Sequence, residues 1–561
     1  MLQQAQLRSE PDLTARALLS GLAVGALLCV ANLYMGLKTG IWDSGHVTAS
    51  ILAFALASGR LGRLENNVAQ TAAVSAGAVP AAAGLLGAVP ALALLGRSPP
   101  AWGVALWGLA LALVGVGFAV ALRRRLVEEE RLPFPTGVAT AEVIEALHAG
   151  GGAGRGRARA LVSGSLLGAV LGWFRDGRPT WIPSVLPMPG SLAGAPAAAL
   201  GFGISTSPLL IGVGLVVGLR VASSMLLGSL LAWGVLGSWL VRGLHVAPSQ
   251  GALFAWLSWP GTALLVGAAA VAIAQQARSL GGALRDLRAV AGGGPRGRDV
   301  LLALGVCVAI VVLGSIVFDL HPFHTLLALA LSVVFATVCA RSAGLTDVVP
   351  LGPVGQLTQA IFGGLVPGQP ALNVAAGSVP AGDATQTTVL LWSFRAGSTL
   401  RAPVRPQVLA AIAGCAVGAA VCMPAYQLLI HAYGLGSPTL PIPTGVQWKA
   451  MAEVAARGSD ALPPGALPAV VCAAALGVLL AALGSTRLGR WLPSAFAVGI
   501  GMLVPVNYSA AILLGALALT AGDRLRPGFR RESGPVAGAG LIAGDSVVGL
   551  LVALLRSFAL L

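Results

Sequence analysis

Three acidic residues stand beside glycine or proline in otherwise apolar parts of the sequence: Glu65, Glu142 and Asp383. Glycine and proline interrupt helices, and an interrupted helix leaves backbone groups free to bind a ligand. A buried carboxylic acid holds a proton more readily than an exposed one, and a carboxylate can also bind an amine. Each acid is therefore a candidate to carry a proton or to contact a substrate.

Glu65 begins a run of polar side chains at near-helical spacing. The run continues with Asn66, Asn67, Gln70, Thr71 and Ser75. In one interpretation these side chains form a polar stripe that faces a substrate cavity. In the other, Glu65 lies at a helix N-terminus that Asn66 or Asn67 caps, and pairs with Arg60 and Arg63. Both interpretations stay open at this point.

Glu142 follows the break Pro-Phe-Pro-Thr-Gly and shares one predicted helical face with Glu145 and His148. This face could relay protons or contact a substrate amine. It could equally belong to an amphipathic cytoplasmic helix, because Arg155 and Arg157 follow closely.

Asp383 comes directly after Val-Pro-Ala-Gly, and Thr385 and Gln386 add uncharged hydrogen-bonding groups beside it. The alternative to a site here is a hydrogen-bonded helix kink. Lys38, at the end of the first apolar segment, could meet a substrate carboxylate or extend to the membrane interface.

The sequence predicts no metal site and no cofactor. Asp319, His321 and His324 offer three potential ligands, but Pro322 would break the helix that aligns them, and a solvated loop is the commoner outcome. The six cysteines lie in apolar runs without a Cys-x-x-Cys pair, which is typical of small buried residues. No phosphate-binding loop is recognisable.

Composition excludes a soluble fold. The chain of 561 residues is 56% hydrophobic and only 10% charged, with a mean hydropathy of +0.85. A soluble domain carries about 25% charged residues to solvate its surface. The net charge of +15 does not indicate nucleic-acid binding, because the arginines lie between apolar segments, as topology-setting charges do.

We therefore predict an all-α polytopic membrane bundle of about 14–16 transmembrane helices, some re-entrant or broken, since one crossing needs about 20 apolar residues. The expected crossings include 202–219 and 222–241, whereas 346–367 and 491–504 are doubtful because glycine and proline interrupt them. The arginines of 123–131, 155–159 and 524–531 are expected in the cytoplasm, together with the N-terminus.

Two halves of the chain share motifs in the same order. VSAGAVPA (74–81) recurs as VAAGSVPA (374–381), LPFPTGV (132–138) as LPIPTGV (440–446), and WIPS (181–184) as WLPS (491–494). This order predicts a duplication, with a first repeat at 1–277, a basic cytoplasmic linker at 278–298 and a second repeat at 299–561. Repeated bundles place substrate near mid-membrane at the repeat interface. Segments 65–83 and 373–388 are therefore expected to pack near each other, as broken helices that line one polar cavity. Asp383 stands where the first copy has Ala83, so this acid would make such a site asymmetric.

Several motifs resemble the prokaryotic branch of the oligopeptide transporter family. They are NLYMGLKTG (32–40), the ENN…QT…SAG block (65–77), LPFPTGVATAEV (132–143), TDVVPLGPVGQLTQ (346–359), GDATQTT (382–388) and GLIAGDS (540–546). The resemblance covers nearly the whole chain and implies a duplicated, proton-driven importer of peptides or metal chelates. The sequence departs from the usual pattern at 382–399, where the family tends to have an acidic residue and a Lys-Thr-Gly run. Of the properties that the resemblance implies, substrate choice is the one that this departure affects.

The function predicted is a secondary active, proton-coupled importer of small peptides or peptide-like metal chelates, not an enzyme. It would reside in the bacterial cytoplasmic membrane, with protons and lipid as partners and a homodimer left open. The alternatives are a membrane-embedded lipid-modifying enzyme, which would need a clustered acid and histidine site, and a passive channel, which would usually show a repeated polar ring. A panel of labelled peptides and chelates with an imposed pH gradient would separate them.

Overall fold

The computed structural model describes residues 12–148, 152–292, 297–346, 349, 351–437 and 439–557. The first half contains α2 (Ala15–Thr39), α3 (His46–Leu56), α4 (Arg63–Gly77), α5 (Val79–Ala82), α6 (Ala88–Leu94), α7 (Ala101–Arg123), α8 (Pro135–His148), α9 (Gly152–Asp176), α10 (Pro208–Ser229), α11 (Gly237–Gly243) and α12 (Gln250–Gly292). The second half contains α13 (Gly297–Phe318), α14 (Pro322–Thr346), α15 (Leu351–Leu365), α16 (Pro370–Leu400), α17 (Val404–Tyr433), α18 (Pro443–Arg457), α19 (Ala466–Gly484), α20 (Ala495–Leu503), α21 (Val506–Leu525), α22 (Phe529–Glu532) and α23 (Gly534–Ser557).

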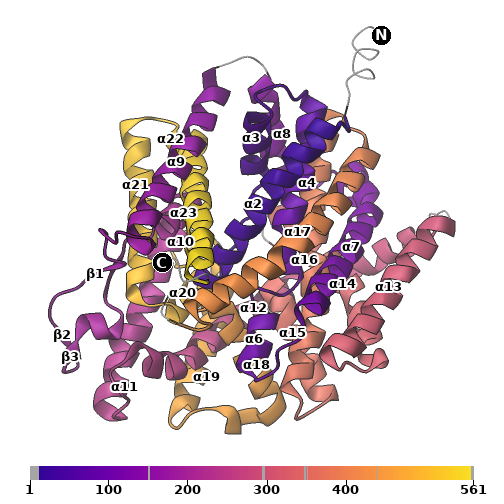
Figure 1. Cartoon of the computed structure of the whole chain (residues 1–561). Helices are drawn as coiled ribbons and strands as arrows, with labels where there is room; N and C mark the ends of the chain where they lie inside the picture. The colour runs from indigo at the N-terminus through magenta and orange to yellow at the C-terminus, as the bar shows by residue number, and fades with distance from the viewer. Residues whose placement is uncertain are drawn as a thin grey trace.

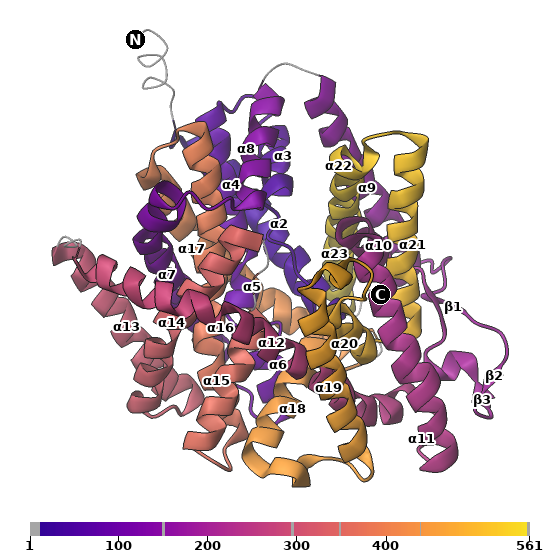
Figure 2. The same ribbon diagram turned by 180° about the vertical axis from the view of Figure 1, so that it is seen from behind.

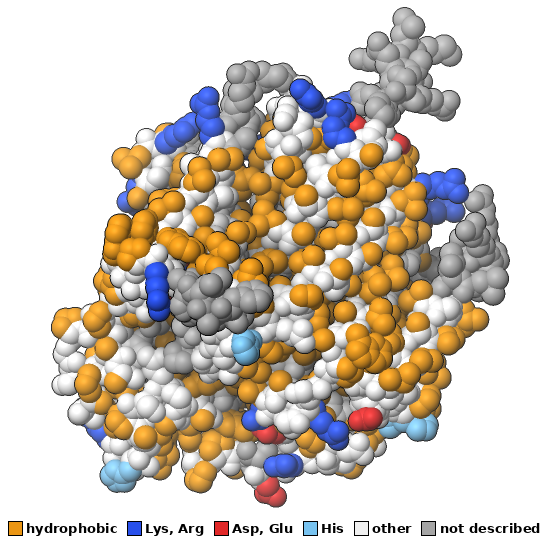
Figure 3. Space-filling model, viewed as in Figure 1, with side chains coloured by type: hydrophobic (Ala, Val, Ile, Leu, Met, Phe, Trp, Pro, Cys, Tyr) orange, Lys and Arg blue, Asp and Glu red, His pale blue; other side chains and the backbone are white. Residues whose placement is uncertain are grey.

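The helices form one bundle with α16 near its middle. Figures 1 and 2 show α13 and α14 on one flank of α16 and α9, α21 and α23 on the other. Nine helices in the described part of the chain are long and apolar enough to cross a membrane. Hydrophobic side chains cover most of the bundle's side in Figure 3, whereas most charged side chains gather towards its upper and lower ends. The predicted all-α polytopic membrane fold is confirmed.

Short helices occupy the segments whose crossing was doubtful. Helices α15 and α20 have 15 and 9 residues, fewer than the roughly 20 that cross an apolar layer alone. Helix α3 is also short, with 11 residues. Helix α10 is interrupted at Gly218, whose φ of 76° is non-helical, near the end of the predicted span 202–219.

Two small hairpins replace the start of one predicted span. Strands β1 (Val185–Pro187) and β4 (Gly203–Ser205) pair antiparallel, as do β2 (Ser191–Leu192) and β3 (Ala195–Pro196). The prediction that a span begins at 202 is therefore wrong. Residues 202–205 are apolar enough to suggest a helix, but they complete a hairpin, and the helix begins only at Pro208.

The predicted linker is helical over much of its length. Helix α12 continues to Gly292 and α13 begins at Gly297. Residues 293–296 lie outside the described residues, and the repeat boundaries at 277 and 299 stay a prediction.

The repeated Leu-Pro-x-Pro-Thr-Gly motifs have the same backbone geometry. Phe134 and Ile442, which occupy the same place in the two copies, have left-handed φ angles of 42° and 46°. Bulky residues rarely adopt this conformation. The Phe134 amide donates to Gly344 O near the end of α14, and the Ile442 amide donates to Leu37 O near the end of α2, both at 2.9 Å. Each copy thus joins the opposite half of the chain in the same way, which supports the duplication.

The two copies of VxAGxVPA cross in opposite directions. Leu64 at the start of α4 packs with Leu400 at the end of α16, whereas Ala88 in α6 packs with Val374 near the start of α16. Between these ends, a Cβ on Gly382 would lie 2.4 Å from Ala82 O. Ala82 and Gly382 are equivalent in the repeat. We infer that the halves are inverted about a pseudo-two-fold axis near this contact, which sequence alone left undecided.

The predicted helix breaks occur in one copy only. The first copy is divided into α4, α5 and α6, and Gly84 between α5 and α6 has a φ of 73°. The second copy is the continuous helix α16, with Pro380 inside it. The prediction of a broken helix at 373–388 is therefore wrong. Its physical reason lies in the residues after proline: Gly84 and Gly87 correspond to Ala384 and Thr387, which favour a helix over a turn.

Candidate functional site

Asp383 lies on helix α16 directly after Gly382, the residue that contacts Ala82, and is completely buried. Neither carboxyl oxygen has a hydrogen-bond partner among the described residues. Ser332 of α14 faces this region, but its hydroxyl donates to Ala328 O at 3.1 Å. On another side, a Cβ on Gly115 of α7 would lie 2.4 Å from Asp383 O, so the two helices are in close contact. Asp383 is thus a sealed acid beside the crossing of the two halves.

Helices α16 and α15 carry buried side-chain amides that have no hydrogen-bond partner among the described residues. On α16 these are Asn373 and Gln386; on α15 they are Gln356 and Gln359. Helix α15 packs against α16, where a Cβ on Gly377 would lie 2.9 Å from Gln359 Cγ. Thr385, by contrast, is satisfied, because its hydroxyl donates to Ala381 O at 2.7 Å.

The predicted polar stripe of α4 is buried throughout and packs against α16 from the other repeat. Asn66 has no partner for either side-chain atom, and Ser75 has none for its hydroxyl. Gln70 donates to Asn67 Oδ1 at 3.3 Å and to Thr71 Oγ1 at 3.0 Å. Helices α4 and α16 thus share an interface, as expected for the segments 65–83 and 373–388. Ser75 of the stripe lies instead beside Gly414 of α17, where a Cβ on Gly414 would be 3.1 Å from Ser75 Cβ.

Glu65 belongs to a helix terminus and not to this unpartnered group. Its carboxylate accepts from the Gly62 amide at 2.7 Å, the Thr14 hydroxyl at 2.5 Å and the Arg16 guanidinium at 3.0 Å. These donors tie the starts of α2 and α4 together and stabilise an ionised carboxylate. The contacts favour the helix-terminus interpretation, with Arg16 as the partner.

Glu142 is exposed on α8, as is Glu145. His148, on the same helix, contacts Ile144 O at 2.7 Å and Leu61 O at 2.8 Å through its two ring nitrogens. The structure does not bring Glu142 to the α16 interface, and its exposure favours the amphipathic-helix interpretation.

Lys38 is buried at the end of α2, so it does not extend to the surface. Its ammonium donates to Tyr34 Oη at 3.0 Å and lies 4.7 Å from the centre of the Tyr34 ring. The Tyr34 ring lies 6.1 Å from the Tyr433 ring, centre to centre, in a tilted arrangement, and the Tyr433 hydroxyl donates to Gly549 O of α23 at 2.9 Å. Lys38 therefore belongs to a second buried polar region, apart from Asp383.

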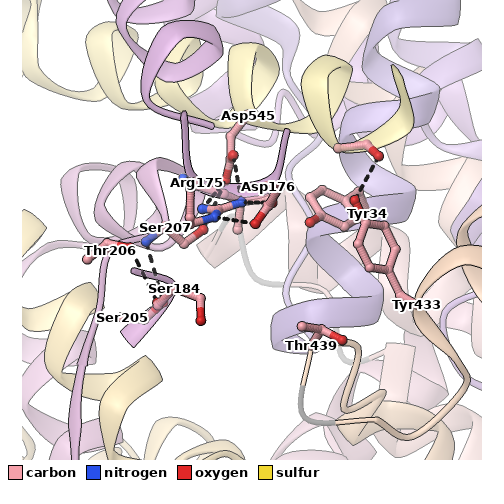
Figure 4. Close-up of polar contacts among 12 residues, drawn as sticks. Tyr34, Arg175, Asp176, Ser184, Ser205, Thr206, Ser207, Tyr433, Thr439 and Asp545 are labelled. Carbon is pink, nitrogen blue, oxygen red and sulfur yellow. Dashed lines mark hydrogen bonds and ion pairs between the residues drawn. The ribbon is translucent and has the colours of Figure 1, made fainter. Parts of the chain in front are cut away.

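The same region contains a charged network that sequence reasoning missed (Figure 4). Arg175, at the end of α9, donates to Asp545 of α23 at 3.0 and 3.3 Å, and also pairs with its neighbour Asp176. Asp545 further accepts from the Ser207 hydroxyl at 2.9 Å and the Leu209 amide at 3.1 Å. The side chains of Arg175 and Asp545 are 3% and 0% exposed. A charge inside an apolar run was the available signal for each residue, but only the fold joins positions so far apart in sequence.

The α16 interface can offer hydrogen bonds to a polar ligand. Buried polar groups in folded proteins almost always have a partner in the protein, in water or in a ligand. Here several amides and one acid have none within the described chain. Among the described residues no group of three His, Cys, Asp or Glu side chains is placed to hold a metal ion. Asp319 instead lies 3.6 Å from Arg97 in an exposed pair.

Comparison with known proteins gives a consistent match along the chain. Residues 12–290 and 299–556 match the family described as OPT oligopeptide transporter protein. A Haemophilus influenzae protein named as an oligopeptide transporter is 25% identical over 93% of this chain and 92% of its own length. A Saccharomyces cerevisiae protein with the same kind of name is 23% identical, covering 90% of each chain. A rice protein named as a metal-nicotianamine transporter is 24% identical over 96% of this chain and 89% of its own.

Proposed function

The chain belongs to the oligopeptide transporter family, and we propose that it imports small peptides or peptide-like metal chelates by coupling their entry to the proton gradient. The protein is a multi-pass membrane transporter and not an enzyme, as the family and its named relatives indicate. The substrate class and the coupling to protons are the parts of this function that we propose. Relatives named for oligopeptides and for metal–nicotianamine complexes support these two substrate classes.

The proposal depends on one observation: Asp383 is fully buried, and neither of its carboxyl oxygens has a hydrogen-bond partner among the described residues. A buried carboxylate without a partner is far more costly than a buried carboxylic acid. When the site is sealed, this acid is suited to hold a proton; when the site opens to water, the carboxylate can be solvated and the proton can leave. Glu65 and Glu142 lack this property in the structure, because the first is saturated by donors and the second is exposed. We therefore assign the coupling role to Asp383.

Substrate binding is proposed at the surrounding amides. An amide side chain both donates and accepts, so it can satisfy peptide groups or the oxygen atoms of a chelate. Gln386 and Asn373 of α16, Gln359 of α15, and Asn66 with Gln70 of α4 are the residues proposed to make these contacts. They come from both halves, so a relative movement of the halves would change which side of the membrane the ligand meets.

The orientation follows from charge. We propose that the chain resides in the bacterial cytoplasmic membrane with its N-terminus inside, because arginine-rich connections favour the cytoplasmic side. The bacterial relative supports this membrane. In this orientation protons and substrate enter together from the outside.

The test is transport by purified protein in liposomes under an imposed inward proton gradient, using a panel of labelled peptides and metal chelates. Asp383→Asn, which mimics the protonated acid, should abolish accumulation above equilibrium while retaining exchange of internal for external substrate. Asp319→Asn is the matched control, because the Asp319 side chain is 81% exposed, and should accumulate substrate like the parent. Normal accumulation by Asp383→Asn would refute the coupling role, and a parent that only equilibrates substrate would indicate a passive channel.

A further inference from the structure

A hollow of about 250 Å³ opens between α10 and the segment that precedes α20. It is lined by Arg220, Ser223, Ser224, Leu227, Arg490, Trp491, Leu492 and Pro493. The lining thus has two arginines and no acidic residue. It includes Trp491 and Leu492 of the repeated WLPS motif, which the proposed transport site does not use.

Neither arginine of the hollow pairs with a carboxylate among the described residues. Arg220 Nε and Nη2 donate to Leu492 O at 3.3 and 3.2 Å, and Nη2 also donates to Gly489 O. These neutral acceptors fix the guanidinium but leave its charge uncompensated. The Arg490 guanidinium lies 5.5 Å from the centre of the Trp491 ring. No ion pair joins either arginine to an acid within the described ranges. Two positive charges that line the same hollow favour an anion between them.

The rim of the hollow is suited to lipid. The side chains of Trp491 and Leu488 are 78% and 60% exposed, and Leu227 in the lining is also exposed. Trp181, in the other copy of the motif, is 69% exposed. Exposed tryptophan beside arginine is typical of the headgroup level of a membrane, where the ring contacts the acyl region and the cation meets phosphate. Basic pockets between transmembrane helices bind anionic headgroups.

We propose that this hollow binds the phosphate headgroup of an anionic phospholipid. Arg220 and Arg490 pair with the phosphate, and Trp491 with Leu227 contacts the start of the acyl chains. The two guanidinium groups share the single negative charge of the phosphodiester, and the acyl chains cover the exposed apolar side chains of the rim. Because the bound lipid would bridge α10 and the α19–α20 connection, it would stabilise their contact.

The experiment measures lipid binding to the purified full-length protein by native mass spectrometry, titrating a phosphatidylglycerol against a phosphatidylcholine with identical acyl chains. The parent should retain phosphatidylglycerol in preference. Arg490→Gln should weaken that binding about fivefold, which corresponds to about 1 kcal/mol for one basic residue beside anionic lipid. Arg490→Lys should recover part of the affinity. Arg487→Gln is the matched control, since Arg487 is an exposed arginine of the same short helix that does not line the hollow.

Each other outcome overturns the proposal. Equal binding of the two lipids by the parent would show that no anion is recognised. Equal weakening by Arg487→Gln and Arg490→Gln would show diffuse surface attraction in place of a site. Displacement of phosphatidylglycerol by inorganic phosphate would show that the hollow recognises a free anion and that the lipid chains contribute nothing. Arg490 makes no hydrogen bond to the described part of the chain, so in detergent without added lipid its variants should unfold at the parent's temperature.

Discussion

Replacing Asp545 by alanine should destabilise the protein strongly, because this carboxylate joins three helices. It accepts two hydrogen bonds from Arg175 of α9, one from the Ser207 hydroxyl and one from the Leu209 amide at the start of α10. Removing one partner of a buried ion pair costs about 3–5 kcal/mol, because the remaining charge stays buried. Asp176 still pairs with Arg175, so we expect the lower end, about 3 kcal/mol. At about 2 °C for each kcal/mol, the apparent unfolding temperature would fall by about 6 °C.

The assay is thermal unfolding in detergent, followed by intrinsic fluorescence at a fixed heating rate, because membrane proteins often unfold irreversibly. Asp545→Asn keeps one acceptor oxygen and should lose less than Asp545→Ala. The double variant Arg175→Met with Asp545→Leu removes the charges of this pair and should restore only part of the loss, because Asp176 then loses its ion pair with Arg175. Asp319→Ala serves as the exposed control. An Asp545→Ala protein that unfolds within about 1 °C of the parent would refute the claim that this network holds the helices together.

The remaining predictions concern the helix ends, the crossing and the orientation. Glu65→Gln should lower stability by about 1–2 kcal/mol, since it weakens charge-assisted hydrogen bonds, yet leave gradient-driven accumulation intact; lost accumulation in a folded variant would return this acid to the coupling role. Gly382→Val should prevent folding, because its Cβ would meet the opposite repeat at 2.4 Å, whereas Gly364→Val, with no atom within 4 Å of that Cβ, should fold, as size-exclusion profiles would show. In a cysteine-free background, Ser279→Cys should escape a membrane-impermeant thiol reagent added to whole cells. Asp460→Cys, in the α18–α19 connection at the opposite end of the bundle from the start of α2 (Figure 1), should react. The reverse labelling pattern would invert the orientation.

Composition and repeated motifs were enough to predict the membrane class and the pairing of segments. An apolar chain with so few charges must be covered by lipid, and the shared LPxPTGV motif predicted equivalent turns, which Phe134 and Ile442 confirm with nearly equal φ angles. The relative direction of the repeats could not be predicted, because a motif match contains no information on orientation. It follows only from contacts such as Ala82 with Gly382.

The sequence predicted which residue types form the candidate site, but not which of these side chains have hydrogen-bond partners in the fold. A polar residue in an apolar run has the same appearance in sequence whether it is satisfied or not. Thr385 bonds within its own helix and Glu65 is saturated by α2, whereas Asp383 and Gln386 have no partner in the described chain. These differences depend on which side of each helix faces which neighbour. The Arg175–Asp545 pair was missed for the same reason, since residues 370 positions apart are joined only by packing.

The coupling role of Asp383 is tested most directly by measuring whether protons move together with substrate. Proteoliposomes containing a pH-sensitive dye would receive a transported substrate, identified from the panel, without an imposed gradient. For the parent, substrate entry should acidify the lumen, because each transported molecule brings protons with it. For Asp383→Asn, substrate exchange should continue while this acidification disappears. Acidification by the Asp383→Asn protein equal to that of the parent, at the same rate of substrate entry, would contradict the assignment of Asp383 as the coupling site.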